Sequence, residues 1–321
     1  MNKINLDKKD IQILGILDWN ARMPLTQIAK KIRLNKDVVR YRINNLEKNG
    51  VIEGYYTVIN TSKLGYITIR VYLDFINVNN VIEKKIINYL NKNFNASQIF
   101  SIEGEYQLGI IAWEKSIFDL DRKMRDFKKL FGNYINKEQI SIITLFNQYP
   151  RKFLLDNKQV IKIEESELFK IKEDDLRILS EISKNSRVSS VDLSFKLKIP
   201  QTTIIHRIKE LEKAKIILGY RVKINISKLD YQNYFIEIYT KNNSEVNKII
   251  DFSIANKNCI YSLNVFPGAD LELETEFTDK LELFDFINHL RNSFKSIKKI
   301  KYWSTINYHN INYFPQKVEE K

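Results

Sequence analysis

Basic and amide side chains recur at helical spacing near the amino-terminal end of the chain. Lys36, Arg40, Asn44 and Lys48 follow one another every fourth residue, and Tyr41 lies beside them. An arginine can donate two hydrogen bonds to the edge of a guanine, and an asparagine pairs in the same way with adenine. Lysines at the two ends of such a face suit phosphates. The pattern therefore predicts a helix face that contacts nucleic acid.

A second, poorer version of this face occurs 165 residues later. Its polar members are Gln201, Thr202, His206 and Lys209. The segment 22–49 holds eight basic and two acidic residues, whereas the equivalent segment 187–214 holds six and three. We therefore expect the second face to be the weaker ligand for a polyanion.

Arg42 and its counterpart Arg207 lie between the polar face and the apolar stripe of the same predicted helix. Either arginine can contact DNA, or it can form an ion pair with an acid of the same domain, such as Asp10 for Arg42. The sequence leaves both roles open.

The two faces occupy equivalent places in an internal repeat. Residues 6–66 align without a gap with residues 171–231, and about a third of the aligned positions are identical. Arg42-Ile43 matches Arg207-Ile208, for example. Chance does not hold one register over such a length. The chain is a duplication, and two copies are too few for a solenoid.

Each repeat begins with the pattern of three short helices. Asp7 and Asn35 are suitable caps for the first and third helix, Pro24 or Leu25 opens the second, and Gly50 ends the third. The segment 51–59 is rich in β-branched and aromatic residues, as expected of a two-stranded wing. Three helices and a wing predict a winged helix-turn-helix head.

A βαββαβ pattern follows each head and predicts a ferredoxin-like sensor domain. The expected strands are 67–75, 97–102, 108–113 and 139–146, then 235–240, 259–265, 271–277 and 300–308; the expected helices are 81–93, 117–131, 245–255 and 281–294. The predicted fold class is α+β, with two winged helix-turn-helix domains alternating with two ferredoxin-like domains.

These patterns divide the chain into six segments. We expect heads at 1–62 and 170–227, sensor domains at 63–150 and 228–315, an exposed charged linker at 151–169 and a charged tail at 316–321.

Composition narrows the class of protein. The formal net charge of +13 favours a polyanionic partner. A single cysteine, Cys259, and three scattered histidines predict no disulfide and no metal site, and no cofactor is expected. No apolar run approaches the roughly 18 residues of a membrane-spanning helix, and residues 1–7 lack the apolar stretch of a secretory signal. We expect a cytoplasmic protein with no membrane partner.

The succession of a winged head and a βαββαβ domain, with the segments Asn49–Tyr55 and Lys63–Tyr66, resembles the Lrp/AsnC (feast/famine) family of transcription regulators. The resemblance covers nearly the whole chain, twice. It implies binding of double-stranded DNA by the third helix, dimerisation through the sensor sheets and response to a small effector such as an amino acid. Tandem fusion departs from the single-copy subunit that is usual in the family.

In that family, a glycine-containing turn between the second and third sensor strands lies near the effector pocket. The turn carries Gly104 and Gln107 in the first copy, and Gly268 and Asp270 in the second. Gln107 stands where an acid is common, so the resemblance leaves Asp270 to provide the counter-charge for an amino group.

Two other functions stay open. Sirohaem decarboxylases are similar to this family and also pair two such modules, and they are expected to use basic residues and histidine in the sensor domain. The histidines here are His206 in the third predicted helix of the second head, His289 in the last helix of the second sensor, and His309. The first sensor has none. A partner-binding protein whose heads no longer bind DNA is the third reading.

The third sensor strands predict how the sensors pair. Both faces of the first are apolar and include Ile111 and Trp113, whereas the second presents Glu272, Glu274 and Glu276 on one face. Burying three carboxylates without basic partners would cost several kcal/mol each. We therefore expect first-copy sensors to pair between two chains, as a homodimer with four heads.

Overall fold

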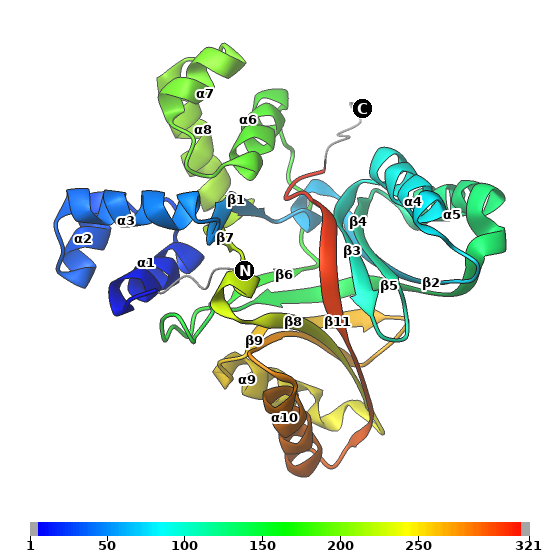
Figure 1. The fold of residues 1–321 in the computed structure, drawn as a ribbon. Coiled ribbons are helices and arrows are strands. Elements are labelled where there is room, and N and C mark those ends of the chain that lie inside the picture. Colours follow the sequence, from blue (N-terminus) through cyan, green and yellow to red (C-terminus); the bar gives the residue numbers. More distant parts are fainter. Residues whose placement is uncertain (1–5, 316–321) are drawn as a thin grey trace.

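The helical heads follow the predicted pattern in the computed structural model, which describes residues 6–315 (Figure 1). The expected charged tail, 316–321, lies outside the described residues. The Asp7 carboxylate accepts hydrogen bonds from the backbone N–H groups of Lys9 and Asp10, and Asn35 caps the third helix. The head helices are α1 (Lys8–Trp19), α2 (Leu25–Ile32) and α3 (Lys36–Lys48), then α6 (Glu173–Lys184), α7 (Ser190–Leu197) and α8 (Gln201–Lys213).

The wing differs from the prediction. Segment 51–59 forms one strand, β1 (Ile52–Ile59), which pairs antiparallel with β7 (Ile217–Ile224) of the second head. The expected two-stranded wing within 51–59 is therefore wrong. Tyr55 and Tyr56 point to opposite sides of β1 and both are buried, so the two faces of this strand pack against protein. Its backbone partners come from the other copy.

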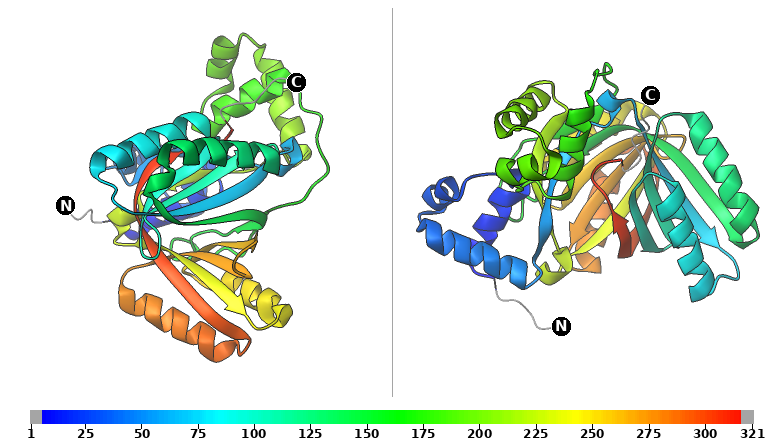
Figure 2. Two further views of the ribbon diagram at one scale, coloured as in Figure 1. Left: turned by 90° about the vertical axis from the view of Figure 1, so that its right-hand side faces the viewer. Right: turned by 90° about the horizontal axis from the view of Figure 1, so that it is seen from above.

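Both sensors have the expected βαββαβ order. The first contains β2 (Ile67–Phe75), α4 (Asn80–Asn93), β3 (Ala96–Glu103), β4 (Leu108–Glu114), α5 (Ile117–Phe131) and β5 (Ile135–Gln148). The second contains β8 (Gln232–Thr240), α9 (Val246–Ala255), β9 (Cys259–Phe266), β10 (Leu271–Phe277), α10 (Lys280–Ser293) and β11 (Ile297–Ile311). The helices lie on the outer side of each sensor (Figures 1 and 2).

The two sensors of one chain pair with each other. Strand β5 pairs with β9, and β11 pairs with β3, so the order is β2-β4-β3-β11-β8-β10-β9-β5, with β2–β5 pairing closing the ring. An aromatic cluster is buried between the two sensors and includes Tyr72, Phe100, Phe235 and Trp303. The inner face of the first sensor is thus covered by the second.

The expected pairing of first-copy sensors between chains is wrong because two members of the acidic stripe (Glu272, Glu274 and Glu276 on β10) have basic partners within the chain. Glu272 forms a buried ion pair with Arg70 on β2. Glu276 accepts from Arg151 at 2.7 Å. Trp113 is also covered, since it packs into the core of the second head.

Part of the expected exposed linker is buried. Leu154 packs into the core of the first head, and the short strand β6 (Ile161–Glu164) pairs with β5. The linker therefore helps to hold the first head against the sensors. No helix within residues 6–315 is long and apolar enough to cross a membrane.

Candidate nucleic-acid interface and head–sensor cavity

The predicted reading face of α3 is open to solvent. Val39, Ile43 and Leu46 face the head core. The opposite side exposes Lys36, Arg40, Tyr41, Asn44 and Lys48. Tyr41 keeps 66% of its surface exposed, although it is a large aromatic residue. These five side chains are free to meet a ligand.

Arg40 has one contact on its own helix, an ion pair with Asp37 at 2.8 Å. Both side chains are at least half exposed, and ion pairs of this kind contribute little to stability. A phosphate or a guanine can therefore replace Asp37 at low cost.

Arg42 and Arg207 are engaged within their heads. The Nη1 of Arg42 lies 2.7 Å from Asp7 and 2.8 Å from Asp10. Backbone N–H groups, that of Asp10 first, and Arg42 itself hold the pKa of the Asp7 carboxyl below its usual range. Arg207 pairs in the same way with the buried Asp175. The ion-pair role predicted as one of two alternatives is confirmed, and it ties α3 and α8 to the start of the first helix of their heads.

The face of α8 is also exposed but differs in charge. Its outward side chains include Gln201, Thr202, His206 and Lys209. The Nε2 of Gln201 donates to Ser190 on α7 at 2.9 Å. Lys209 is followed directly by the acidic Glu210, which is exposed too.

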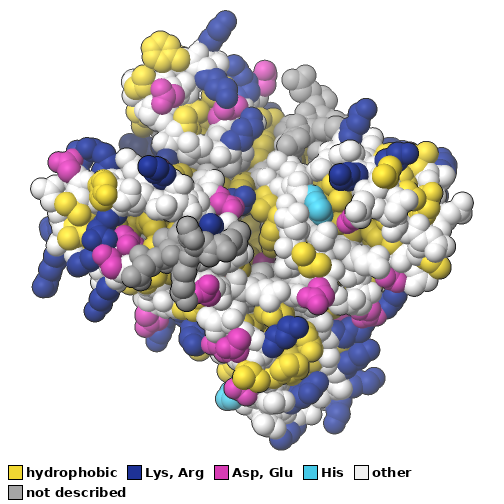
Figure 3. All heavy atoms as spheres, viewed as in Figure 1, with side chains coloured by type: hydrophobic (Ala, Val, Ile, Leu, Met, Phe, Trp, Pro, Cys, Tyr) yellow, Lys and Arg dark blue, Asp and Glu magenta, His cyan; other side chains and the backbone are white. Residues whose placement is uncertain are grey.

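The two heads are fixed to each other by reciprocal contacts. The guanidinium of Arg22 in the first head lies over the ring of Tyr220, 5.0 Å from its centroid, and that of Arg187 in the second head lies over Tyr55 at 4.9 Å. Each arginine thus stacks on the strand of the other head, beside the β1–β7 ladder. Lys and Arg side chains project from both heads in Figure 3.

The predicted effector turns are held in the same way in both copies. The Oε1 of Gln107 accepts from the backbone N–H of Phe75 at 3.0 Å, and the Oδ2 of Asp270 accepts from that of Thr240 at 2.6 Å. Gly104 and Gly268 lie on two separate turns, with φ of 154° and 147°. A Cβ at Gly104 would come within 2.7 Å of the Trp303 Cβ, so close packing requires this glycine. Gln107 and Asp270 both fasten their turns to the end of the first sensor strand.

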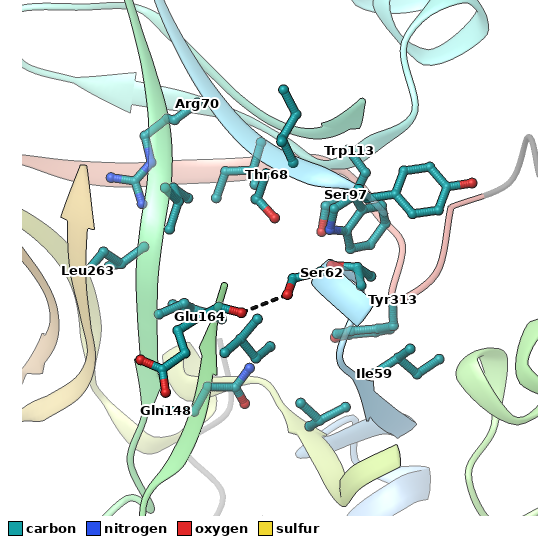
Figure 4. A pocket seen from close by; sticks show the side chains of 18 of the residues that line it. Ile59, Ser62, Thr68, Arg70, Ser97, Trp113, Gln148, Glu164, Leu263 and Tyr313 are labelled. Atoms are coloured by element: carbon teal, nitrogen blue, oxygen red, sulfur yellow. Dashed lines mark hydrogen bonds between the residues drawn. The ribbon is translucent and has the colours of Figure 1, made fainter. Parts of the chain in front are cut away.

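A cavity of about 570 Å³ lies where the β1–β7 ladder meets the sensors (Figure 4). We call it the head–sensor cavity. Its wall comes from β1, β2, β3, β4, β5, β6, β9 and β10, and from residues 312 and 313 near the carboxyl end. In Figure 4, Arg70 lies at the upper left of the cavity and Trp113 at its upper right, and Glu164 and Gln148 lie lower in the view, on the left. None of the predicted effector residues lines it. This site was not predictable from the sequence, because its wall is assembled from segments that are far apart along the chain.

The charges on the cavity wall are mainly negative. Glu164, Glu165 and Glu274 line it, whereas Arg70 is the basic residue among its described lining and already pairs with Glu272. Burial raises the pKa of Glu274 to about 7, against the opposing effects of the Arg70 charge and a hydrogen bond from Asn233.

The three histidines lie apart from one another. His206 is exposed on α8, and His289 stacks on Phe252 at the outer side of the second sensor. The Nε2 of His309 on β11 lies 2.7 Å from the Oγ of Ser101. None of them lines the cavity.

Comparison with known proteins shows sequence similarity in both heads. The model of a winged helix-turn-helix DNA-binding family matches residues 6–53 and 174–217. The HTH-type transcriptional regulator LrpA of Pyrococcus abyssi is 32% identical over 117 residues, which span 36% of this chain and 80% of LrpA. LrpA of Pyrococcus horikoshii is 49% identical over 61 residues, 19% of this chain and 43% of that protein.

Solved structures of one protein match nearly the whole chain in fold. The crystal structure of the siroheme decarboxylase NirDL superposes with a TM-score of 0.65 and covers 96% of this chain and 94% of its own. The sequence identity is 12%, so this likeness concerns the fold.

Proposed function

The chain belongs to the Lrp/AsnC family of helix-turn-helix transcription regulators, as a tandem duplication, and we propose that it binds specific DNA sequences with both heads of a single chain. The observation that supports this most is the exposed polar face of α3, where basic and amide side chains remain accessible while the apolar residues pack inward.

Each side chain of this face has a proposed role. Arg40 and Asn44 are suited to base edges in the major groove, and Lys36 and Lys48 to the phosphates beside it. Tyr41 lies between them and adds a hydroxyl and an apolar ring. Arg42 acts indirectly, because its ion pairs with α1 set the position of the helix.

The second head is the weaker contact in this proposal. Gln201, Thr202, His206 and Lys209 would meet the groove, while Arg207 positions α8 as Arg42 positions α3. Because the β1–β7 ladder fixes the heads, one chain would present the two reading helices that a two-fold symmetric regulator presents from two subunits.

A small effector is the second part of the proposal. Regulators of this family respond to small molecules such as amino acids. If the turns bearing Gly104, Gln107, Gly268 and Asp270 bind one, the Oδ1 of Asp270 would accept from the ligand while its Oδ2 keeps the hydrogen bonds from Thr240.

Selection of bound fragments from random DNA tests the proposed function. We expect repeated rounds to enrich one motif with two half-sites, of which that read by α3 is the better defined. Recovery of fragments without a common motif would contradict sequence-specific binding.

The fold likeness to NirDL makes tetrapyrrole decarboxylation the second candidate function. NirDL has been crystallised with an iron-uroporphyrin III analogue, a ligand that carries carboxylates around its ring. The head–sensor cavity fits such a polyanion poorly, because its described lining has three carboxylates and one arginine that is already paired. Addition of iron-uroporphyrin III should leave the absorbance of the porphyrin unchanged. A saturable shift of its band would instead favour the enzyme.

A further inference from the structure

Three side chains form a row across neighbouring strands on the cavity wall. Gln148 on β5 is paired in register with Tyr261 on β9, and Tyr261 is paired with Glu274 on β10. Residues opposite one another in antiparallel strands point to the same face of the sheet, so the three side chains share one face. All three line the head–sensor cavity. We call them the acceptor row.

The acceptor row contains a buried oxygen without a partner. Gln148 is 6% exposed, and its Oε1 accepts no hydrogen bond from the described part of the chain. A second such oxygen, the Oε1 of Gln98, belongs to another lining residue. An unsatisfied buried acceptor is costly, and buried polar groups normally have a partner. The wall therefore offers acceptors to a ligand that donates.

Among the three carboxylates of the acidic stripe, Glu274 has no basic partner among the described residues. Glu272 pairs with Arg70 and Glu276 with Arg151, whereas within residues 6–315 no lysine or arginine lies at ion-pair distance from Glu274. Glu274 is 8% exposed, and one of its oxygens accepts from Asn233 at 2.8 Å. A buried carboxylate in this position is stabilised by a cation that enters the cavity.

Another part of the wall is apolar and aromatic. Tyr56 and Tyr313 stack with their ring centroids 3.8 Å apart, and Trp113 lies on another side of the cavity. A cavity of about 570 Å³ lies within the size range of small-molecule sites, which combine apolar walls with a few convergent polar groups.

We propose that the head–sensor cavity binds a small organic ammonium ion, whose N–H groups are accepted by the acceptor row and whose apolar body packs against the aromatic wall. This site is distinct from the turns at Gly104 and Gly268, and it goes beyond the proposed DNA binding. Since β1 forms part of the wall, the ligand contacts both the sensors and the ladder that joins the heads.

Calorimetric titration of the full chain with three matched probes tests the site. The probes are 2-phenylethylamine, 2-phenylethanol and phenylacetate, which share a ring and differ in charge. We expect the amine to bind at least about tenfold more tightly than the alcohol, because hydrogen bonds to charged groups exceed neutral ones by that order. Phenylacetate should bind least.

Two substitutions locate the bound amine. Glu274→Gln and Gln148→Leu should each weaken binding of 2-phenylethylamine by about tenfold, whereas Asp285→Asn on the outer side of α10 should leave it unchanged. If a variant fails to fold, the comparison of the three probes on the unaltered chain still tests the site.

A cavity that is merely hydrated gives a different outcome. If the amine and the alcohol bind within about twofold of each other, or if no probe binds in the millimolar range, the inference is overturned. The titrations contain no DNA, so their failure leaves the proposed function standing, and failure of DNA binding leaves the ammonium site standing.

Discussion

The Nη1 of Arg151 lies 2.8 Å from the Oδ1 of Asp18, and the two side chains are 11% and 1% exposed. Arg151 follows the first sensor, and Asp18 lies in α1 of the first head. The same arginine pairs with Glu276 on β10, and Asp18 also accepts from Arg221 on β7. This network joins both heads and the second sensor at one buried point. The positions of the heads therefore depend on the sensors.

Removal of Arg151 should strongly destabilise the chain. Burial alone would raise the pKa of Asp18, and the charges of Arg221 and Arg151 outweigh it and hold that pKa below its usual range. Arg151→Leu leaves the buried Glu276 without a cation and Asp18 with Arg221 alone, and breaking a buried ion pair in this way typically costs about 3–5 kcal/mol. Chemical denaturation measures the loss. Arg125→Leu, which breaks an exposed ion pair with Asp121, should cost under about 1 kcal/mol. Equal effects of the two changes would contradict the importance of the buried network.

Glu274→Gln should change how stability depends on pH. The pKa of Glu274 is raised to about 7, so between its unfolded value and pH 7 the folded chain holds a proton that the unfolded chain has released. Stability contributed by this group thus falls as pH rises through that window, by up to roughly 3 kcal/mol. Glutamine does not titrate, so the melting temperature of the variant relative to the unaltered chain should increase from pH 5 to pH 8. Asp285→Asn should show no such trend. A difference that is constant with pH would exclude the raised pKa.

Arg40→Ala and Arg42→Ala should separate reading from positioning. Arg40 is half exposed and faces outward, so its loss should relax base preference at one position and cost about 1–3 kcal/mol on the preferred site. Arg42 pairs with Asp7 and Asp10, so its loss should lower the stability of the head and weaken binding to all sequences alike. Binding to preferred and random DNA, compared for each variant, measures this. Equal losses for Arg40→Ala on both DNAs would show that Arg40 contacts phosphate alone.

Trp113→Glu should unfold the second head locally and leave the mass of the particle unchanged. Trp113 is 8% exposed and packs with Tyr66 and Phe314, within the same chain. Placing a carboxylate there should cost several kcal/mol. Sedimentation at matched concentrations compares the masses. Halving of the mass on substitution would indicate that Trp113 joins two chains.

Local periodicity was sufficient to predict the helices of the heads and the order of sensor elements, because these patterns repeat within short windows. Local periodicity could not predict the strands that pair with β1 and β5, because each of these two strands pairs with a strand of the other copy. Arg70 and Glu272 show the same limit. Both were visible in the sequence, but only the pairing of the sensors brings them together and makes burial of the acidic stripe tolerable. The exposed face of α3 was predictable because helical spacing alone assigns its sides.

The slope of log affinity against log salt concentration tests the central claim, that α3 is the main contact with DNA. Neutralising Lys36, Arg40 and Lys48 together should flatten this slope by up to about three units, because each phosphate contact contributes nearly one. The matched change neutralises Lys209 and Lys213 on α8 together. It should flatten the slope by less than the roughly two units that one phosphate contact for each lysine would give. An unaltered slope for the α3 variant, or an equal effect of the α8 variant, would contradict the account.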